Sequence, residues 1–267
     1  MREAWAGRKV PGALAALAAA FLASGCVTMG GHVPLAQEER GKLGDLTVRS
    51  VVVQDEIVLT APEPGVVQAA GGGLLAALVE SSIVKERQDA LQGVIEPFYS
   101  QIDDYDFRRE FWSALVPFLR NGYPLPVASV VTTPVTVPKL FASRWAAELP
   151  AGKPVMVLRT RYTFADQFRR LEVETDLELW QRGRQEPAFA NLYKYQSASL
   201  GGGDRDSIGQ WSANGGARYR QALAEGIAET LRMLRLDAAG TPGELLEPRP
   251  GRAIARTKEG RLVSSPR

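Results

Sequence analysis

The sequence contains few of the residues that most often carry out catalysis or bind metals. Among its 267 residues there is one cysteine, Cys26, and one histidine, His32. A Ser/His/Asp triad needs a histidine as its base, and a histidine-rich zinc site needs several. His32 lies in a glycine-rich, polar segment near the N-terminus. We therefore expect no catalytic residue, no metal site and no cofactor.

An excess of charge of one sign is also missing. Lysine and arginine number 32 against 30 aspartate and glutamate residues, which is a formal net charge of +2. Arg2, Arg8 and Lys9 outnumber Glu3 near the N-terminus, so the rest of the chain is close to neutral. Proteins that bind nucleic-acid phosphates use an excess of basic side chains. We therefore expect no nucleic-acid partner.

Apolar runs long enough to cross a membrane are absent as well. The run from Gly12 to Leu22 is shorter than the about 20 residues that a membrane-spanning helix needs. It follows a basic segment and ends at the small residues 23–25. This order of basic, apolar and small residues is typical of a secretory signal peptide. We therefore predict a signal peptide over residues 1–25.

The segment LASGC, Leu22 to Cys26, resembles the lipobox of bacterial lipoproteins, although Ala23 stands where leucine is commonest. The resemblance implies that Cys26 is acylated and becomes the new N-terminus. It also implies the periplasmic face of the outer membrane, because Val27 stands where aspartate is the usual inner-membrane retention signal. Acylation would occupy a lone thiol that has no disulfide partner, which leaves no Cys/His nucleophile. The alternative is an ordinary signal peptide with a chance cysteine.

Composition divides the remaining chain into three parts. Residues 26–45 are rich in glycine and polar residues, and we interpret them as a lipidated tether. Residues 46–237 carry the periodic segments and are expected to form a single periplasmic domain. In residues 238–267 proline, glycine and arginine become frequent and periodicity disappears. We expect this last part to be a disordered basic tail.

The periodic segments predict both strands and helices. Clusters of β-branched residues and alternating patterns predict strands within 46–62, 127–133, 154–163, 169–180 and 189–200. Helical spacing predicts helices at about 73–99, 106–121 and 215–236, and residues 139–149 form a short helix or an apolar loop. This order fits an α+β fold, with a mostly antiparallel sheet and amphipathic helices packed on one face.

The two central strands have a predicted register. In the second of them apolar or threonine side chains alternate with acids, which is typical of a strand with one wet face. Opposite charges pair if Arg161 faces Glu172 and Arg159 faces Glu174. A shift by one residue would place both arginines opposite apolar residues. We therefore expect these pairs on the solvent face and Leu158 in the core.

The order of elements behind the leader resembles that of small periplasmic α/β domains in envelope lipoproteins. Such domains occur in curli-secretion-type, Tol-associated and penicillin-binding-protein-activator lipoproteins. The resemblance is one of architecture, and it implies a role in envelope assembly. It assigns no functional residue to this chain.

Acidic side chains are the strongest candidates for chemistry, because glycosidases need only two carboxylates. Asp103 and Asp104 are adjacent, and a second series alternates along a strand at Glu172, Glu174, Asp176 and Glu178. This series could also bind a cation. A solvated turn and a wet strand face paired with arginines explain both sets without a catalytic role, and we favour these explanations.

Two other patterns have weaker functional interpretations. The segment GGGLLAA, residues 71–77, lacks the lysine and serine of a phosphate-binding loop, so close helix packing explains it better. Four tryptophans could line a sugar groove, although core packing is favoured for them: Trp112, Trp145, Trp180 and Trp211.

Two functions therefore remain open from the sequence. The first is a lipid-anchored, non-enzymatic envelope lipoprotein that docks a protein partner or helps to assemble an envelope complex. The second is a protein that binds or hydrolyses peptidoglycan or another glycan with paired carboxylates. A deep pocket with two convergent carboxylates would favour the second, and exposed apolar surface would favour the first.

Overall fold

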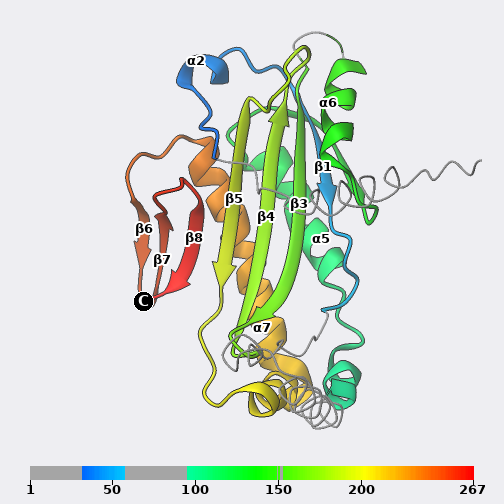
Figure 1. Cartoon of the computed structure of the whole chain (residues 1–267), viewed down its shortest axis with the longest axis vertical. Helices are drawn as coiled ribbons and strands as arrows, with labels where there is room; N and C mark the ends of the chain where they lie inside the picture. Colours follow the sequence, from blue (N-terminus) through cyan, green and yellow to red (C-terminus); the bar gives the residue numbers. More distant parts are fainter. Residues whose placement is uncertain (1–31, 58–94, 149, 151–152) are drawn as a thin grey trace, which may run out of the picture. The chain divides into compact units, whose positions relative to one another are not determined.

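The computed structural model describes residues 32–57, 95–148, 150 and 153–267 (Figure 1). The predicted signal peptide, the predicted lipidation site Cys26 and the glycine-rich segment 71–77 lie outside the described residues. The same holds for most of the helix predicted at 73–99, of which the described part is helical and extends to residue 102. Residues 32–267 belong to one structural unit.

The described chain contains an eight-stranded sheet with the order β2-β1-β3-β4-β5-β8-β7-β6. Its strands are β1 (Leu46–Val51), β2 (Val127–Thr133), β3 (Val155–Ala165), β4 (Arg170–Trp180), β5 (Phe189–Gln196), β6 (Leu245–Arg249), β7 (Arg252–Arg256) and β8 (Leu262–Pro266). The pairs β1–β2, β1–β3 and β5–β8 are parallel, and the other pairs are antiparallel. The predicted mostly antiparallel sheet is therefore a mixed sheet, because helical crossovers connect β1 to β2 and β2 to β3.

The helices cover both faces of the sheet. They are α2 (Gln37–Arg40), α5 (Phe107–Asn121), α6 (Lys139–Glu148) and α7 (Asp204–Ala238), together with helical residues 95–102. Figure 1 shows α5 and α7 behind the strands, where their apolar side chains join the main core. In contrast, Ala142 and Ala146 of α6 pack on Val155 and Val157, which point to the opposite face of β3. The expectation that all helices pack on one face is therefore wrong.

Helix α5 follows its predicted boundaries. The side chain of Asp106 caps the helix by accepting a hydrogen bond from the backbone N–H of Arg109 at 3.1 Å. Gly122 follows the last helical residue. The predicted apolar stripe faces the core, with four buried residues at helical spacing: Phe107, Phe111, Leu115 and Leu119. Local sequence signals are sufficient here because cap, stripe and stop all lie within one segment.

Helix α7 contains a break close to the predicted start of the last helix. The backbone is extended at Ala213 and left-handed at Asn214, Gly215 and Gly216. Glycine tolerates the left-handed region because it has no Cβ. The element therefore consists of two helical segments, and the second contains the amphipathic stripe that the sequence predicted.

Leu158 of the β3–β4 hairpin faces the core as predicted, but the register differs, and the face expected to be solvated carries buried Glu178 and is partly covered by α6. Arg161 pairs with Glu174 and Arg159 pairs with Asp176, so β4 is shifted by two residues from the prediction. Acids occupy every second position of β4, and a shift by two therefore still places an acid opposite each arginine. Charge pairing excludes a shift by one residue but does not distinguish between registers that differ by two.

The hairpin loop selects the observed register. It spans residues 166–169, and Asp166, Gln167 and Phe168 all have left-handed backbone. The side chain of Phe168 is buried, and its carbonyl oxygen accepts a hydrogen bond from Nε1 of Trp211 at 2.6 Å. This contact lies far from the hairpin in sequence, so alternation and charge within the strands could not predict it.

The two segments that flank the predicted domain also belong to the fold. Val33 forms an antiparallel bridge with Ala190, and Leu35 is buried, so the expected tether is structured from residue 32 onward. The expected disordered tail forms β6, β7 and β8 between residues 245 and 266. These strands are short, and contacts with distant parts of the chain stabilise them, which explains why composition predicted disorder.

No helix within the described ranges has both the length and the apolar character needed to cross a bilayer.

Candidate functional site: an acidic pocket

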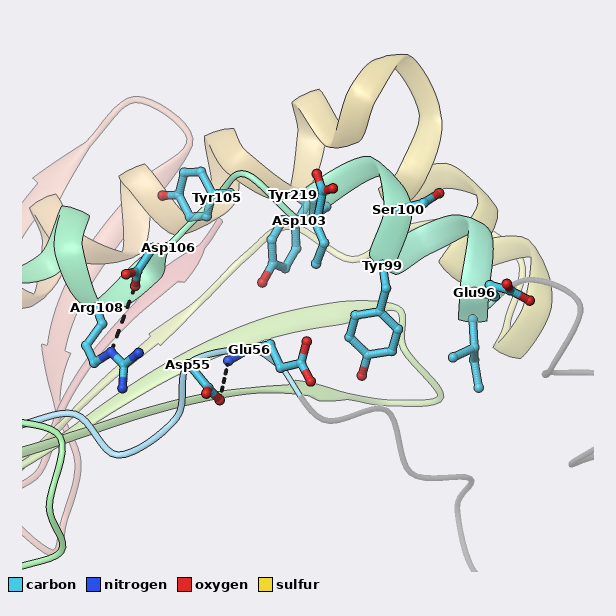
Figure 2. A pocket seen from close by; sticks show the side chains of 12 residues that line it. Asp55, Glu56, Glu96, Tyr99, Ser100, Asp103, Tyr105, Asp106, Arg108 and Tyr219 are labelled. Carbon is cyan, nitrogen blue, oxygen red and sulfur yellow. Dashed lines mark hydrogen bonds and ion pairs between the residues drawn. The ribbon is translucent and has the colours of Figure 1, made fainter.

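A pocket of about 810 Å³ lies between helical residues 95–102, the turn before α5, the segment after β1 and α7 (Figure 2). We call it the acidic pocket. It is lined by five carboxylate side chains, namely Asp55, Glu56, Glu96, Asp103 and Asp106. It is also lined by three tyrosines and one arginine, namely Tyr99, Tyr105, Tyr219 and Arg108.

The segment after β1 forms one wall of the acidic pocket. Gln54 holds this segment to β3, because its amide both donates to the backbone carbonyl and accepts from the backbone N–H of Tyr162, each at 3.0 Å. The side chain of Ile57 is fully buried. Asp55 Oδ1 accepts from the backbone N–H of Glu56 at 3.1 Å. Asp55 and Glu56 therefore lie on a segment that is fixed on both sides, by the hydrogen bonds of Gln54 and by the burial of Ile57.

Helical residues 95–102 and α7 form the opposite wall. Phe98 is fully buried, and its ring packs edge-on against Tyr219, with 5.5 Å between centroids. Figure 2 shows Tyr99 and Tyr219 pointing from the helices toward Asp55 and Glu56. Aromatic rings and carboxylates thus face the same space.

The turn before α5 completes the pocket. The backbone N–H of Tyr105 donates to the carbonyl of Ile102 at 2.9 Å, which ends the preceding helix. Asp106 then caps α5, and Nε of Arg108 lies 4.0 Å from its Oδ1. Arg108 therefore balances the negative charge of Asp106. Acidic side chains still outnumber basic ones among the lining residues.

Two of the pocket tyrosines, Tyr105 and Tyr219, have raised pKa values and remain protonated at neutral pH. Burial, followed by the charge of Glu110, raises the pKa of Tyr105 to about 12. Burial also raises the pKa of Tyr219 far above its ordinary value. A protonated phenol offers a hydrogen-bond donor and an aromatic face. Together with the carboxylates, these groups suit a cationic ligand, which attracts acids by charge and aromatic faces by the cation–π interaction.

The sequence candidates Asp103 and Asp104 have different surroundings. Asp103 lines the pocket. Oδ1 of Asp104 instead lies 2.5 Å from Nη2 of Arg220. Its hydrogen bond with Arg220 lowers the pKa of Asp104. The adjacent pair therefore does not act as one site, and the solvated turn that we favoured accounts for Asp104.

The acidic series of β4 lies on the face opposite the main core and does not line the acidic pocket. Glu172 and Glu174 both contact Nζ of Lys194, at 2.6 Å and 3.3 Å. Asp176 and Glu178 both contact Nη1 of Arg159, at 3.3 Å and 3.0 Å. Ion pairing within the sheet thus accounts for the alternating acids, although Glu172 and Glu178 are buried and do not form the wet face that we expected.

The four tryptophans do not gather around one groove. Trp180 and Trp211 are buried in two different apolar clusters. Trp112 donates from Nε1 to Oγ of Ser50 at 3.2 Å, and the Trp145 ring lies 3.8 Å below the guanidinium of Arg49. The expectation of core packing is confirmed for Trp180 and Trp211, while Trp112 and Trp145 are partly buried at the edges of the clusters.

Potential metal ligands are dispersed in the part of the chain that the structure describes. Within it, no three or more His, Cys, Asp or Glu side chains have the arrangement of a metal site. His32 lies against Gly260 in the turn before β8.

Most residues of the acidic pocket could not be found from the sequence. Of its lining residues, the sequence singled out Asp103 for chemistry and Asp106 as a helix cap. Asp55, Tyr99 and Tyr219 come from segments far apart in the chain and follow no shared motif. Only the packing of α7 on the preceding helical turn brings them together.

Comparison with known proteins assigns no family to this chain. No family model and no curated protein matches it. Among solved structures, the hypothetical protein CT253 from Chlamydia trachomatis is similar over 72% of this chain and 98% of that chain, with 10% sequence identity and a TM-score of 0.23. A likeness at this TM-score supports no statement about fold or function.

Proposed function

We propose that this protein is a lipid-anchored lipoprotein of the bacterial envelope that docks a protein partner and catalyses no reaction. We further propose that the acidic pocket receives a basic segment of this partner. The observation that carries the proposal is the lining of the pocket, which contains five carboxylates and three tyrosines but one arginine. A lysine- or arginine-rich segment complements this charge and these aromatic faces.

The composition of the pocket also supports a role in binding. Its described lining contains no histidine, cysteine or lysine, so carboxylates and Ser100 are the groups there that could act as a base or nucleophile. Burial holds Tyr105 and Tyr219 in the protonated form, which can donate hydrogen bonds. These groups suit recognition of a ligand by charge and by aromatic contact.

The anchor places this docking site at a membrane. Residues 1–25 serve as the signal peptide, Cys26 carries the lipid, and the folded unit faces the periplasm from the outer membrane. Replacement of Cys26 by alanine should abolish incorporation of labelled fatty acid and release the protein from membrane fractions. Unchanged membrane fractionation would contradict the anchor. Replacement of Val27 by aspartate is a matched test of location, because it should shift the lipidated protein toward the inner membrane.

Calorimetric titration tests the docking site. The detergent-solubilised full chain should bind a lysine- and arginine-rich peptide, should bind a glutamate-rich peptide of equal length much more weakly, and should lose affinity as salt increases. The double substitution Asp55→Asn and Glu56→Gln should weaken binding several-fold. The control substitution Glu186→Gln, at an exposed acid outside the pocket, should leave binding unchanged. Equal affinity of the double variant and the control would contradict the proposal.

A glycan is the second candidate ligand, and the carboxylate-lined pocket is a feature in its favour, because carboxylates and aromatic side chains also line sugar sites. Asp103 and Asp55 both line the acidic pocket, and glycoside hydrolysis requires two carboxylates near the scissile bond. Incubation with peptidoglycan fragments distinguishes the two functions. Turnover that is lost in the Asp103→Asn variant would establish the glycosidase and overturn the non-enzymatic proposal. Peptide binding without turnover would support docking.

A further inference from the structure

Among the described strands β2 is an edge of the sheet, and its own sequence lacks the usual protection against pairing. Within the described residues it pairs with β1 on one side, and the sheet order places it at the end. Its sequence, VASVVTT, contains no charged residue and no proline. Natural edge strands usually carry charges, prolines or other features that prevent another chain from adding a strand. The opposite edge, β6, does contain a proline, Pro248.

The backbone of β2 presents hydrogen-bonding groups at this open edge. The carbonyl oxygen of Thr133 accepts a hydrogen bond from the N–H of Val52 at 3.2 Å and is therefore directed toward β1. Because successive residues of a strand direct their backbone groups to opposite sides, those of Thr132 and Val130 are directed outward. Thr132 is exposed. An added strand would find both donors and acceptors there.

Three exposed apolar side chains lie in β2 or shortly after the paired ends of β1 and β2. In the described part of the chain, the large apolar side chains classed as exposed are Val53, Val131, Val135 and Phe141, and Val135 is 66% exposed. Val131 belongs to β2, while Val53 and Val135 follow the paired ends of β1 and β2. Phe141 lies in α6, the next element of the chain. An edge strand and an apolar surface therefore occur together, as they do at protein–protein interfaces.

We propose that β2 is a self-association edge, at which two copies of this chain pair their β2 strands antiparallel across a two-fold axis. A two-fold interface places the same surface on both partners, so any charge near the axis would face its own copy. The absence of charge from β2 removes this repulsion. A strand of neutral, largely β-branched residues thus complements itself, and the neighbouring apolar side chains would add to the buried area. This inference does not depend on the acidic pocket.

The oligomeric state of the detergent-solubilised full chain tests this proposal. Light scattering after size exclusion should give a protein mass of two chains, falling toward one chain on dilution. The Thr132→Pro variant should have the mass of one chain, because the substitution removes an outward N–H and leaves the hydrogen bonds between β2 and β1 intact. Thr132→Lys should also give one chain, because it places a charge at the edge. Thr163→Lys adds the same charge at an exposed position of β3 and should keep two chains.

Circular dichroism and thermal unfolding show whether each variant remains folded. If Thr132→Pro fails to fold, Thr132→Lys decides the outcome. A wild-type protein that stays at the mass of one chain at all concentrations would overturn the proposal. Two chains retained in the folded Thr132→Lys variant would also overturn it, because association would then use another surface. A stable complex of β2 with a different protein's strand, formed by a chain that does not self-associate, would overturn it equally.

Discussion

The hydroxyl of Tyr99 donates a hydrogen bond to the backbone carbonyl of Ile57, with 2.7 Å between the two oxygens. This bond joins helical residues 95–102 to the segment after β1, which form opposite walls of the acidic pocket. Ile57 is fully buried, so water cannot easily replace Tyr99 at this carbonyl. The bond therefore helps to hold the shape of the pocket.

Replacement of Tyr99 by phenylalanine should lower the free energy of unfolding by about 0.5–1.5 kcal/mol, because a buried carbonyl loses its partner. Urea denaturation measures the change. Tyr105→Phe is the matched control, since the hydroxyl of Tyr105 has no hydrogen-bond partner among the described residues. Equal losses in the two variants would show that the bond to Ile57 contributes nothing specific.

Replacement of Gly226 by alanine should destabilise the protein, although alanine favours helices. An added Cβ would lie 2.8 Å from Cγ2 of Val173 and 2.9 Å from Cδ1 of Tyr195, and both side chains are fully buried. Such overpacking costs about 1–3 kcal/mol. Gly209→Ala, also in α7, meets no atom within 4 Å and should stabilise the protein by about 0.5–1 kcal/mol. Thermal unfolding compares the two, and stabilisation by Gly226→Ala would contradict the close approach of α7 to the sheet.

The two arginines of β3 should differ in their effect on stability. Arg159 donates from Nη1 to Glu178 at 3.0 Å, and the Glu178 side chain is only 4% exposed. Without the guanidinium of Arg159, the buried carboxylate of Glu178 loses one of its partners. We therefore expect Arg159→Ala to lower the free energy of unfolding by about 1–3 kcal/mol. Arg161 is 59% exposed, so Arg161→Ala should cost only about 0.2–1 kcal/mol. Chemical denaturation of both variants provides the comparison, and the reverse order would contradict the observed register.

Replacement of Leu158 by alanine should destabilise the protein more than replacement of either arginine, because Leu158 is fully buried in the main core. Leu158→Ala removes apolar contacts and leaves a cavity, for an expected loss of about 2–5 kcal/mol in the free energy of unfolding. The same denaturation series measures it. If Arg159→Ala proved more destabilising than Leu158→Ala, the assignment of the core face of β3 would be wrong.

Glu174 should make stability depend on pH in the acid range. Burial alone would raise the pKa of Glu174, but the hydrogen bond and charge of Arg161 and the charge of Lys194 outweigh it and lower the pKa below 4.5. A lowered pKa in the folded state contributes stability that is fully present above pH 4.5 and is lost as the pH falls through the folded value. Unfolding free energies measured from neutral to acid pH should fall less steeply in Glu174→Gln than in wild type. The exposed control Glu186→Gln should keep the wild-type slope.

Local elements of the fold could be predicted because their determinants lie within single segments. The cap at Asp106 and the stop at Gly122 define α5, and both are observed. Alternation likewise assigned Leu158 to the core face of its strand. In each case the relevant period is a property of the backbone itself, 3.6 residues for a helix and two for a strand.

Features that depend on distant segments could not be predicted in the same way. Acids at every second position of β4 allow two registers, and Trp211 contacts the hairpin loop only after α7 has packed. The parallel pairing of β1 with β2 and β3 follows from helical crossovers that carry no signal within the strands.

The sequence by itself determined the core faces of α5 and β3 and the boundaries of α5, because local periodicity and capping require no partner. Only the tertiary structure decided the strand order, the folding of the C-terminal strands and the acidic pocket. Asp55, Asp103 and Tyr219 acquire a common role because three distant segments meet in space. Arg256 and Asp237 form an ion pair at 2.9 Å that connects β7 to the end of α7. Such contacts form only when a whole core brings them together, and no pattern within one segment encodes them.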